Sequence, residues 1–162
     1  FGREYRYEDR FSEGLVGFWK NQLAGYLDRS GNIVISPVWT VIFPFSGGLA
    51  LVKDNHKNEY FIDKKGNIKI HLKYNSVYSF SDELALVEKD GLTGYIDKEG
   101  NQAIVLQYQS GRDFSEGLGF VQLGEKCFFI NKKGNRAFPG DFNCEDGGTS
   151  EYAKFLDGIA LV

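Results

Sequence analysis

The sequence contains no methionine, three prolines, two cysteines and two histidines among 162 residues, and these shortages exclude several classes of protein. Two cysteines cannot form a disulfide framework, and they supply only half the ligands of a structural zinc site. No apolar run approaches the roughly 18 residues that a transmembrane helix needs, and no secretory leader is visible. The net charge of −3, with both signs interspersed, provides no basic field and argues against nucleic acid as a partner.

Glycine and aromatic residues are abundant instead. The chain has 20 glycines, and 15% of its residues are aromatic, a composition typical of short strands joined by tight turns. No segment has a sustained apolar stripe with a helical period. The composition therefore predicts an all-β protein with a substantial core.

A short motif recurs along the whole chain. Phe-Ser-Glu-Gly-Leu begins at residue 11 and returns in related form at 45, 80, 114 and 155, with spacings of 34, 35, 34 and 41 residues. Such a period indicates tandem repeats. We predict one repeat domain over residues 1–162, and we expect it to be part of a longer protein. Its segments are the tail of a preceding repeat at 1–10, whole repeats at 11–44, 45–79, 80–113 and 114–154, and the head of a further repeat at 155–162.

A second landmark is Asp or Asn, two polar residues and Gly, which occurs at 28–31, 63–66, 97–100 and 131–134. The Asp or Asn side chain can accept hydrogen bonds from the turn backbone, and Gly adopts the positive φ of a bulged hairpin. A calcium-binding loop would need further oxygen ligands and a Glu at its twelfth position, which these segments lack. The landmark therefore predicts a β-hairpin turn.

A third landmark follows each turn glycine: an apolar residue four positions on and an aromatic residue eight positions on. These pairs are Ile35 and Trp39, Ile70 and Tyr74, Ile104 and Tyr108, and Phe138 and Phe142, with Tyr5 as the aromatic of the preceding repeat. The three landmarks predict three short antiparallel strands per repeat, which must stack on neighbouring repeats to bury enough apolar surface. We predict an open, solenoid-like array of three-stranded meanders. The alternative is a closed ring similar to a β-propeller.

These motifs resemble the bacterial WG repeat family, also called the KWG repeat, over essentially the whole chain. The family pattern has a Phe-x-x-Gly-Leu-Ala-x-Val head, a Trp-Gly-Tyr-Ile-Asp-x-x-Gly centre and an Ile-Pro-x-x-Tyr tail. The resemblance implies a β-repeat scaffold, often found beside other modules in secreted or envelope proteins, with no established catalytic residues. In this chain the name-giving Trp is replaced in all four repeats, by Ala24, Glu59, Thr93 and Cys127, and the next Gly remains only as Gly25 and Gly94.

Trp19 and Trp39 lead to different expectations. Trp39 stands where every repeat has an aromatic residue, so we predict that it lies in the core. Trp19 aligns instead with the polar residues Lys53, Glu88 and Gln122. An aromatic ring at a solvent-facing position is a candidate contact for a protein or a sugar. Alternatively, Trp19 covers a terminal edge of the array.

The fourth repeat is irregular, because it has seven extra residues between Phe142 and Phe155 compared with its siblings. Insertions in repeat arrays form loops that often lie on the binding face, although many are tolerated without a role. Cys127 and Cys144 both belong to this repeat. They form either a disulfide that ties the insertion to the second strand or two free thiols.

The sequence contains no set of residues that suggests catalysis. His56 and His71 are isolated, and most carboxylates repeat with the fold rather than forming one unique constellation. We therefore predict a non-catalytic protein-interaction or scaffolding module of a larger bacterial protein, located outside the cytoplasm in the periplasm, on the surface or in the medium. The alternative is a carbohydrate-binding or cell-wall-binding module. We expect no cofactor, no metal site and no membrane insertion.

Overall fold

The computed structural model describes residues 6–7, 10–142, 144, 155–156 and 159–160. The chain divides into two compact units, residues 1–73 and residues 74–162, which we call the first and second unit. The first unit contains the first repeat and most of the second, and the second unit begins with residues 74–79 of the second repeat. Tyr5 and most of the insertion between Phe142 and Phe155 lie outside the described residues.

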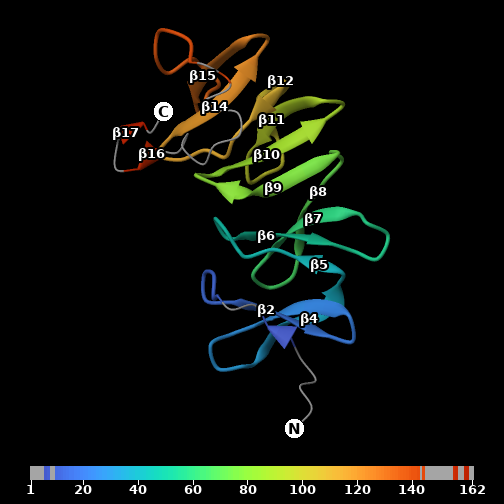
Figure 1. Ribbon diagram of the computed structural model, residues 1–162. Helices are drawn as coiled ribbons and strands as arrows, with labels where there is room; N and C mark the ends of the chain where they lie inside the picture. Colours follow the sequence, from blue (N-terminus) through green and yellow to red (C-terminus); the bar gives the residue numbers. More distant parts are fainter. Residues whose placement is uncertain (1–5, 8–9, 143, 145–154, 157–158, 161–162) are drawn as a thin grey trace. The chain divides into compact units, whose positions relative to one another are not determined.

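The first unit contains two antiparallel sheets of four strands each (Figure 1). Strands in both sheets follow the order of the chain, as in a meander. One sheet has β1 (Arg6–Tyr7), β2 (Val16–Lys20), β3 (Leu23–Leu27) and β4 (Ile33–Trp39). The other has β5 (Val41–Ile42), β6 (Leu49–Lys53), β7 (Glu59–Asp63) and β8 (Ile68–His71).

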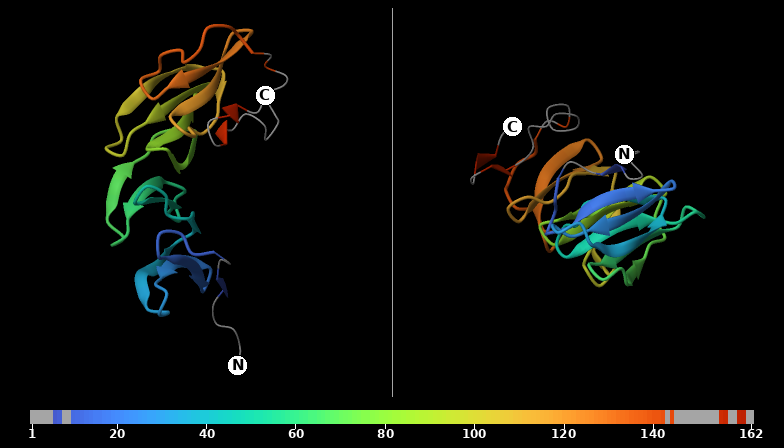
Figure 2. Two further views of the ribbon diagram at one scale, coloured as in Figure 1. Left: turned by 90° about the vertical axis from the view of Figure 1, so that its left-hand side faces the viewer. Right: turned by 90° about the horizontal axis from the view of Figure 1, so that it is seen from below.

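The second unit repeats this plan. One sheet has β9 (Ser76–Ser81), β10 (Leu84–Lys89), β11 (Leu92–Ile96) and β12 (Gln102–Tyr108). The next has β13 (Ser110–Gly111), β14 (Leu118–Leu123) and β15 (Lys126–Asn131), and it lies beside the first one in both views of Figure 2. A two-stranded ribbon of β16 (Phe155–Leu156) and β17 (Ile159–Ala160) contains the head of the fifth repeat.

The prediction of an all-β fold made of antiparallel meanders is confirmed. Among the described residues, no sheet closes into a barrel, and no helix is of a length and hydropathy suited to crossing a membrane. The structure differs from the prediction because each of these sheets has a further strand, which precedes the Phe head or, in β9, includes Phe80. The fourth sheet still has three strands, since isolated bridges of Cys127 with Phe142 and of Ile130 with Arg136 stand where its third predicted strand was expected. Three of these added strands have only two residues, which is too short to produce a periodic signal.

The predicted Asp-x-x-Gly turns are present in every repeat. In the first, Asp28 Oδ1 accepts hydrogen bonds from the backbone N–H groups of Ser30 at 2.8 Å and Asn32 at 2.9 Å. Gly31 has a φ of +82°, a conformation that favours glycine. The other three turns have the same bonds to the Asp or Asn side chain, centred on Asp63, Asp97 and Asn131. The hairpin interpretation is therefore confirmed.

Gly25 and Gly94 permit a close approach between neighbouring strands. A Cβ atom on Gly25 would lie 2.3 Å from the carbonyl oxygen of Ile35, and one on Gly94 would lie 2.7 Å from that of Ile104. The register between the two strands shifts beside both glycines. The family glycine thus allows the long strands β4 and β12 to bulge against their neighbours.

Aromatic contacts join the two repeats of each unit. The Tyr26 ring lies 4.8 Å from Phe45, and its hydroxyl donates to the Phe43 carbonyl oxygen at 2.8 Å. Tyr95 makes the same ring contact with Phe114 at 4.8 Å and donates to Arg112 O at 2.7 Å. Both tyrosines are fully buried. Each therefore contributes ring packing against the next repeat and a buried hydrogen bond to the segment that begins the next sheet.

Acidic side chains at the head turns add polar links within each unit. Glu13 forms an ion pair with Lys64 at 2.9 Å and accepts a bond from Gly48 N at 3.2 Å. The hydrogen bond from Lys64 is the main reason that the pKa of Glu13 lies below its ordinary value. Asp82 forms the matching ion pair with Lys132 at 2.7 Å in the second unit. These links recur because successive head turns lie next to each other.

Candidate functional site

The positions that the resemblance assigns to Trp are equivalent in the structure. Each lies near the start of β3, β7, β11 or β15, beside the preceding hairpin turn. It pairs with one residue near the end of the strand before it, which is β2, β6, β10 or β14. We call these the centre position and the opposite position. The pairs of opposite and centre residues are Trp19 and Ala24, Lys53 and Glu59, Glu88 and Thr93, and Gln122 and Cys127.

In the first repeat, two tryptophans flank the centre position. Ala24 pairs with Trp19 on one side and with Trp39 on the other. Trp39 is 8% exposed, so the prediction that it belongs to the core is confirmed. Trp19 is half-buried and packs against the same core cluster. The small Ala24 side chain is thus covered by an indole ring from the opposite position.

In the second repeat, an ion pair occupies the equivalent place. Lys53 at the opposite position binds Glu59 at the centre position, and the Glu59 side chain is 14% exposed. Tyr60 replaces the family glycine, and its ring lies 5.8 Å from that of Trp39. The loss of glycine here coincides with a short third strand, since β8 has four residues where β4 has seven.

In the fourth repeat, the centre residue Cys127 lies next to Cys144. The structure places the two as a disulfide, with Cα atoms 5.2 Å apart. Cys127 is buried in a small cluster with Phe120 and Phe129, against which Phe142 also packs. Of the two alternatives that the sequence left open, this geometry corresponds to the bonded one.

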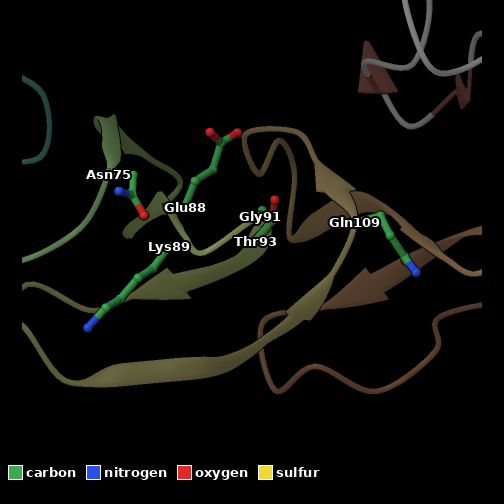
Figure 3. Close-up of a pocket in the computed structure, with 6 residues that line it drawn as sticks. All are labelled: Asn75, Glu88, Lys89, Gly91, Thr93 and Gln109. Carbon is green, nitrogen blue, oxygen red and sulfur yellow. The ribbon is translucent and has the colours of Figure 1, made fainter.

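In the third repeat, the centre position borders a pocket. Thr93 is 2% exposed, and apart from the buried tyrosines, Trp39 and Cys127 it is the one buried residue with a polar side chain among those the structure describes. It lines a pocket of about 190 Å³ together with Glu88 at the opposite position and Gly91 in the turn between them. Asn75, Lys89 and Gln109 complete the lining (Figure 3).

Hydrogen bonds fix the two amide side chains of this pocket. Asn75 Oδ1 accepts from the backbone N–H of Asp90 at 2.8 Å, and Gln109 Oε1 accepts from that of Gly124 at 2.9 Å. Each amide therefore holds the turn of a neighbouring hairpin. Two of the side chains that line the pocket are consequently held in place by backbone hydrogen bonds.

The two charged side chains that line the pocket point in different directions. Figure 3 shows the Glu88 carboxylate and the Lys89 ammonium extending away from each other, as expected for consecutive residues of a strand. The pKa of Tyr78 is raised by burial and, to a lesser degree, by the negative charges of Glu88 and Asp113. The negative charges of Glu88 and Asp113 therefore both act on the Tyr78 hydroxyl.

Sequence reasoning named Trp19, Cys127 and Cys144 but missed the pocket. The structure brings the two cysteines together, and it places Trp19 in the other unit. A signal for Asn75 and Gln109 was available, because a polar residue follows the tail aromatic in all four repeats. In the first three this residue binds the next hairpin turn. These contacts join Thr40 to Asp54 O, Asn75 to Asp90 N, and Gln109 to Gly124 N.

Comparisons with known proteins bear on the repeat. The model of the WG containing repeat family matches residues 25–57, 61–92 and 94–127. No curated protein matches the chain.

Several solved structures share a limited similarity with the chain. Hsv2 from Kluyveromyces lactis is 10% identical with a TM-score of 0.46, and the match covers 78% of this chain and 44% of Hsv2. A form of KlHsv2 with loop 6CD replaced by a Gly-Ser linker is 11% identical with a TM-score of 0.49, over 80% and 49% of the two chains. A protein of unknown function from Bacteroides caccae is 17% identical with a TM-score of 0.39, over 84% and 59%. The chain thus spans roughly half the length of the first of these structures.

Proposed function

The chain belongs to the WG-containing repeat family, and from that premise we propose that it is a non-catalytic module that binds another protein. We place it within a larger protein of the cell envelope or the secreted fraction. The repeat array supplies a scaffold, and the binding contacts come from residues that differ between repeats. This is how repeat proteins generally separate stability from recognition.

The observation that supports this proposal is a group of exposed apolar side chains in the first repeat. Ile33, Val34, Val38, Val41 and Phe43, which we call the apolar strip, are between 38% and 57% exposed. Ile33, Val34 and Val38 lie on β4, an edge strand of its sheet, whereas Val41 lies on β5 of the other sheet and Phe43 just after it. No charged residue occurs from Gly31 to Val52. Exposed apolar side chains that gather in one stretch of the chain can mark a contact with another protein.

A capture experiment with matched variants tests the proposal. The chain is fixed to a resin and exposed to an extract of the cells that produce it, and bound proteins are identified by mass spectrometry. The variant Val34→Lys/Val38→Lys places charges in the apolar strip and should lose the specific partner. Val105→Lys makes the same change on the exposed strand β12 of the second unit, where Val105 is 55% exposed, and should retain it. No specific capture, or equal capture by both variants, would contradict the proposal.

Carbohydrate binding remains the second candidate, and it rests on Trp19. The half-buried position of this ring against the core supports a structural role for it. A glycan array tests the alternative directly. Saccharide binding that disappears in Trp19→Ala, and persists in Val34→Lys/Val38→Lys, would replace protein binding as the proposed function.

A further inference from the structure

The space beside the centre position is filled differently in each repeat. Trp19 covers it in the first repeat, the ion pair of Lys53 and Glu59 occupies it in the second, and the disulfide of Cys127 occupies it in the fourth. In the third repeat the described part of the chain provides no such group, and the space is the pocket above Thr93. The equivalent site is thus filled from within the chain in three repeats and open in one.

We propose that this pocket receives the side chain of a lysine or arginine from the bound partner. The inference rests on the proposed function, since it assumes that the partner is a protein. The volume of about 190 Å³ lies below the range of roughly 300–1,000 Å³ that is usual for small-molecule sites. A pocket of this size is suited to one side chain.

The second and third repeats differ in the charged residues at the opposite and centre positions, and this difference favours a cationic side chain as the ligand. In the second repeat, Lys53 and Glu59 form an ion pair across the two strands. In the third repeat, the residue at the opposite position is Glu88, which supplies the carboxylate, and the residue at the centre position is the uncharged Thr93. Within the described residues Glu88 forms no ion pair. A cation from a partner would supply the missing half of the pair that the second repeat forms internally.

The other polar groups of the pocket are compatible with an ammonium or guanidinium group. The amide oxygens of Asn75 and Gln109 each accept one backbone hydrogen bond and keep a second lone pair. The Thr93 side chain forms the buried floor. Lys89 is the one cation of the lining, and its ammonium extends away from the Glu88 carboxylate (Figure 3). These groups can hold a cation that Glu88 attracts.

The test uses single amino-acid probes and does not require the partner. The ¹⁵N-labelled chain is titrated with Nα-acetyl-arginine amide and Nα-acetyl-lysine amide, and amide chemical shifts are followed by NMR. Nα-acetyl-norleucine amide and Nα-acetyl-glutamate amide are the apolar and anionic controls. We expect saturable shifts at the amides of Gly91 and Thr93 with the cationic probes only, weakening as salt is added.

Two variants of adjacent residues separate electrostatic attraction from a change in structure. Glu88→Gln keeps the shape of the side chain and should weaken binding of the cationic probes about tenfold, the usual effect of removing one charged hydrogen-bond partner. Lys89→Gln removes a charge of the opposite sign from the same strand and should leave binding unchanged or strengthen it. Equal affinity of both variants and the unaltered chain would overturn the inference.

A third variant tests the pocket itself. Thr93→Trp restores the residue that the family has at the centre position and should block the probes, while the NMR spectrum shows whether the fold persists. If this variant does not fold, the comparison of Glu88→Gln with Lys89→Gln still decides. Stronger binding of norleucine or glutamate amide than of the cations would also refute the inference. None of these results depends on the apolar strip, so failure here is distinguishable from failure of the proposed function.

Discussion

The buried hydroxyl of Tyr26 offers a direct test of how the two sheets of a unit are joined. Tyr26 is 1% exposed, and its hydroxyl donates to the Phe43 carbonyl oxygen at 2.8 Å. Tyr26→Phe removes this donor and leaves a carbonyl without that partner, which costs about 1–2 kcal/mol. The ring itself should remain in place, because Phe61 and Phe129 occupy the equivalent position in the second and fourth repeats. Tyr26→Ala removes the ring as well and should cost about 3–5 kcal/mol.

Urea unfolding measures these losses. Trp19 and Trp39 both belong to the first unit, so tryptophan fluorescence follows the unit that contains Tyr26. With an m-value of about 2 kcal/mol/M, Tyr26→Phe should lower the midpoint by roughly 0.5–1 M. The control is Tyr78→Phe, the same change at a ring that is 45% exposed, followed by far-UV circular dichroism. It should alter stability by less than about 0.5 kcal/mol. If both variants shift their transitions equally, the buried hydrogen bond does not stabilise the contact between the two sheets.

Three further predictions concern the strands, the turns and the disulfide. Gly25→Ala places a Cβ atom 2.3 Å from a carbonyl oxygen, and we expect it to destabilise the first unit by roughly 1–3 kcal/mol in urea unfolding; an unchanged midpoint would show that the strand moves freely. The hydrogen bond from the Asn58 side chain is the main cause that lowers the pKa of Asp54 to about 2. Because this pKa is depressed, its stabilising effect is present above pH 3.8 and is lost as pH falls towards 2. Carboxyl titration by NMR should show this value and a higher one in Asn58→Ala. Reduction of the bond between Cys127 and Cys144, which are separated by 17 residues, should lower the free energy of unfolding by about 3 kcal/mol in the chain-entropy model. Calorimetry with and without a reductant measures this change. An equal melting temperature in both conditions would show that the two thiols are not bonded.

The repeating parts of the fold were predictable because the same sequence motif occurs in each repeat. The Asp28 turn illustrates this, since an acceptor side chain and a glycine at fixed spacing specify a local structure through hydrogen bonds within five residues. Trp39 was predictable for a similar reason, because every repeat has an aromatic residue at that position. Local chemistry that recurs four times leaves few alternatives.

The candidate site was not predictable, because it depends on which residues meet across strands. The pocket requires Glu88 and Thr93 to be paired and Asn75 and Gln109 to turn their amide oxygens towards two hairpins. A shift of one residue in the register between the strands would separate these groups. The sequence alone showed that Trp is absent from the centre position. It could not show that the space beside this position is filled in the first, second and fourth repeats and open in the third, at Thr93.

The departures from the family pattern become intelligible when the repeats are considered in pairs. The family glycine is kept in the first and third repeats as Gly25 and Gly94, where the next strand approaches closely. In the second and fourth repeats it is replaced by Tyr60 and Phe128, whose rings lie 5.8 Å from Trp39 and 6.3 Å from Tyr108. Each replacement therefore packs against the tail aromatic of the preceding repeat in the same unit. The glycine lets the next strand of the first repeat in a pair approach closely, and the aromatic residue of the second repeat packs against the ring at the end of that strand. The building block of this array is therefore a pair of repeats rather than a single one.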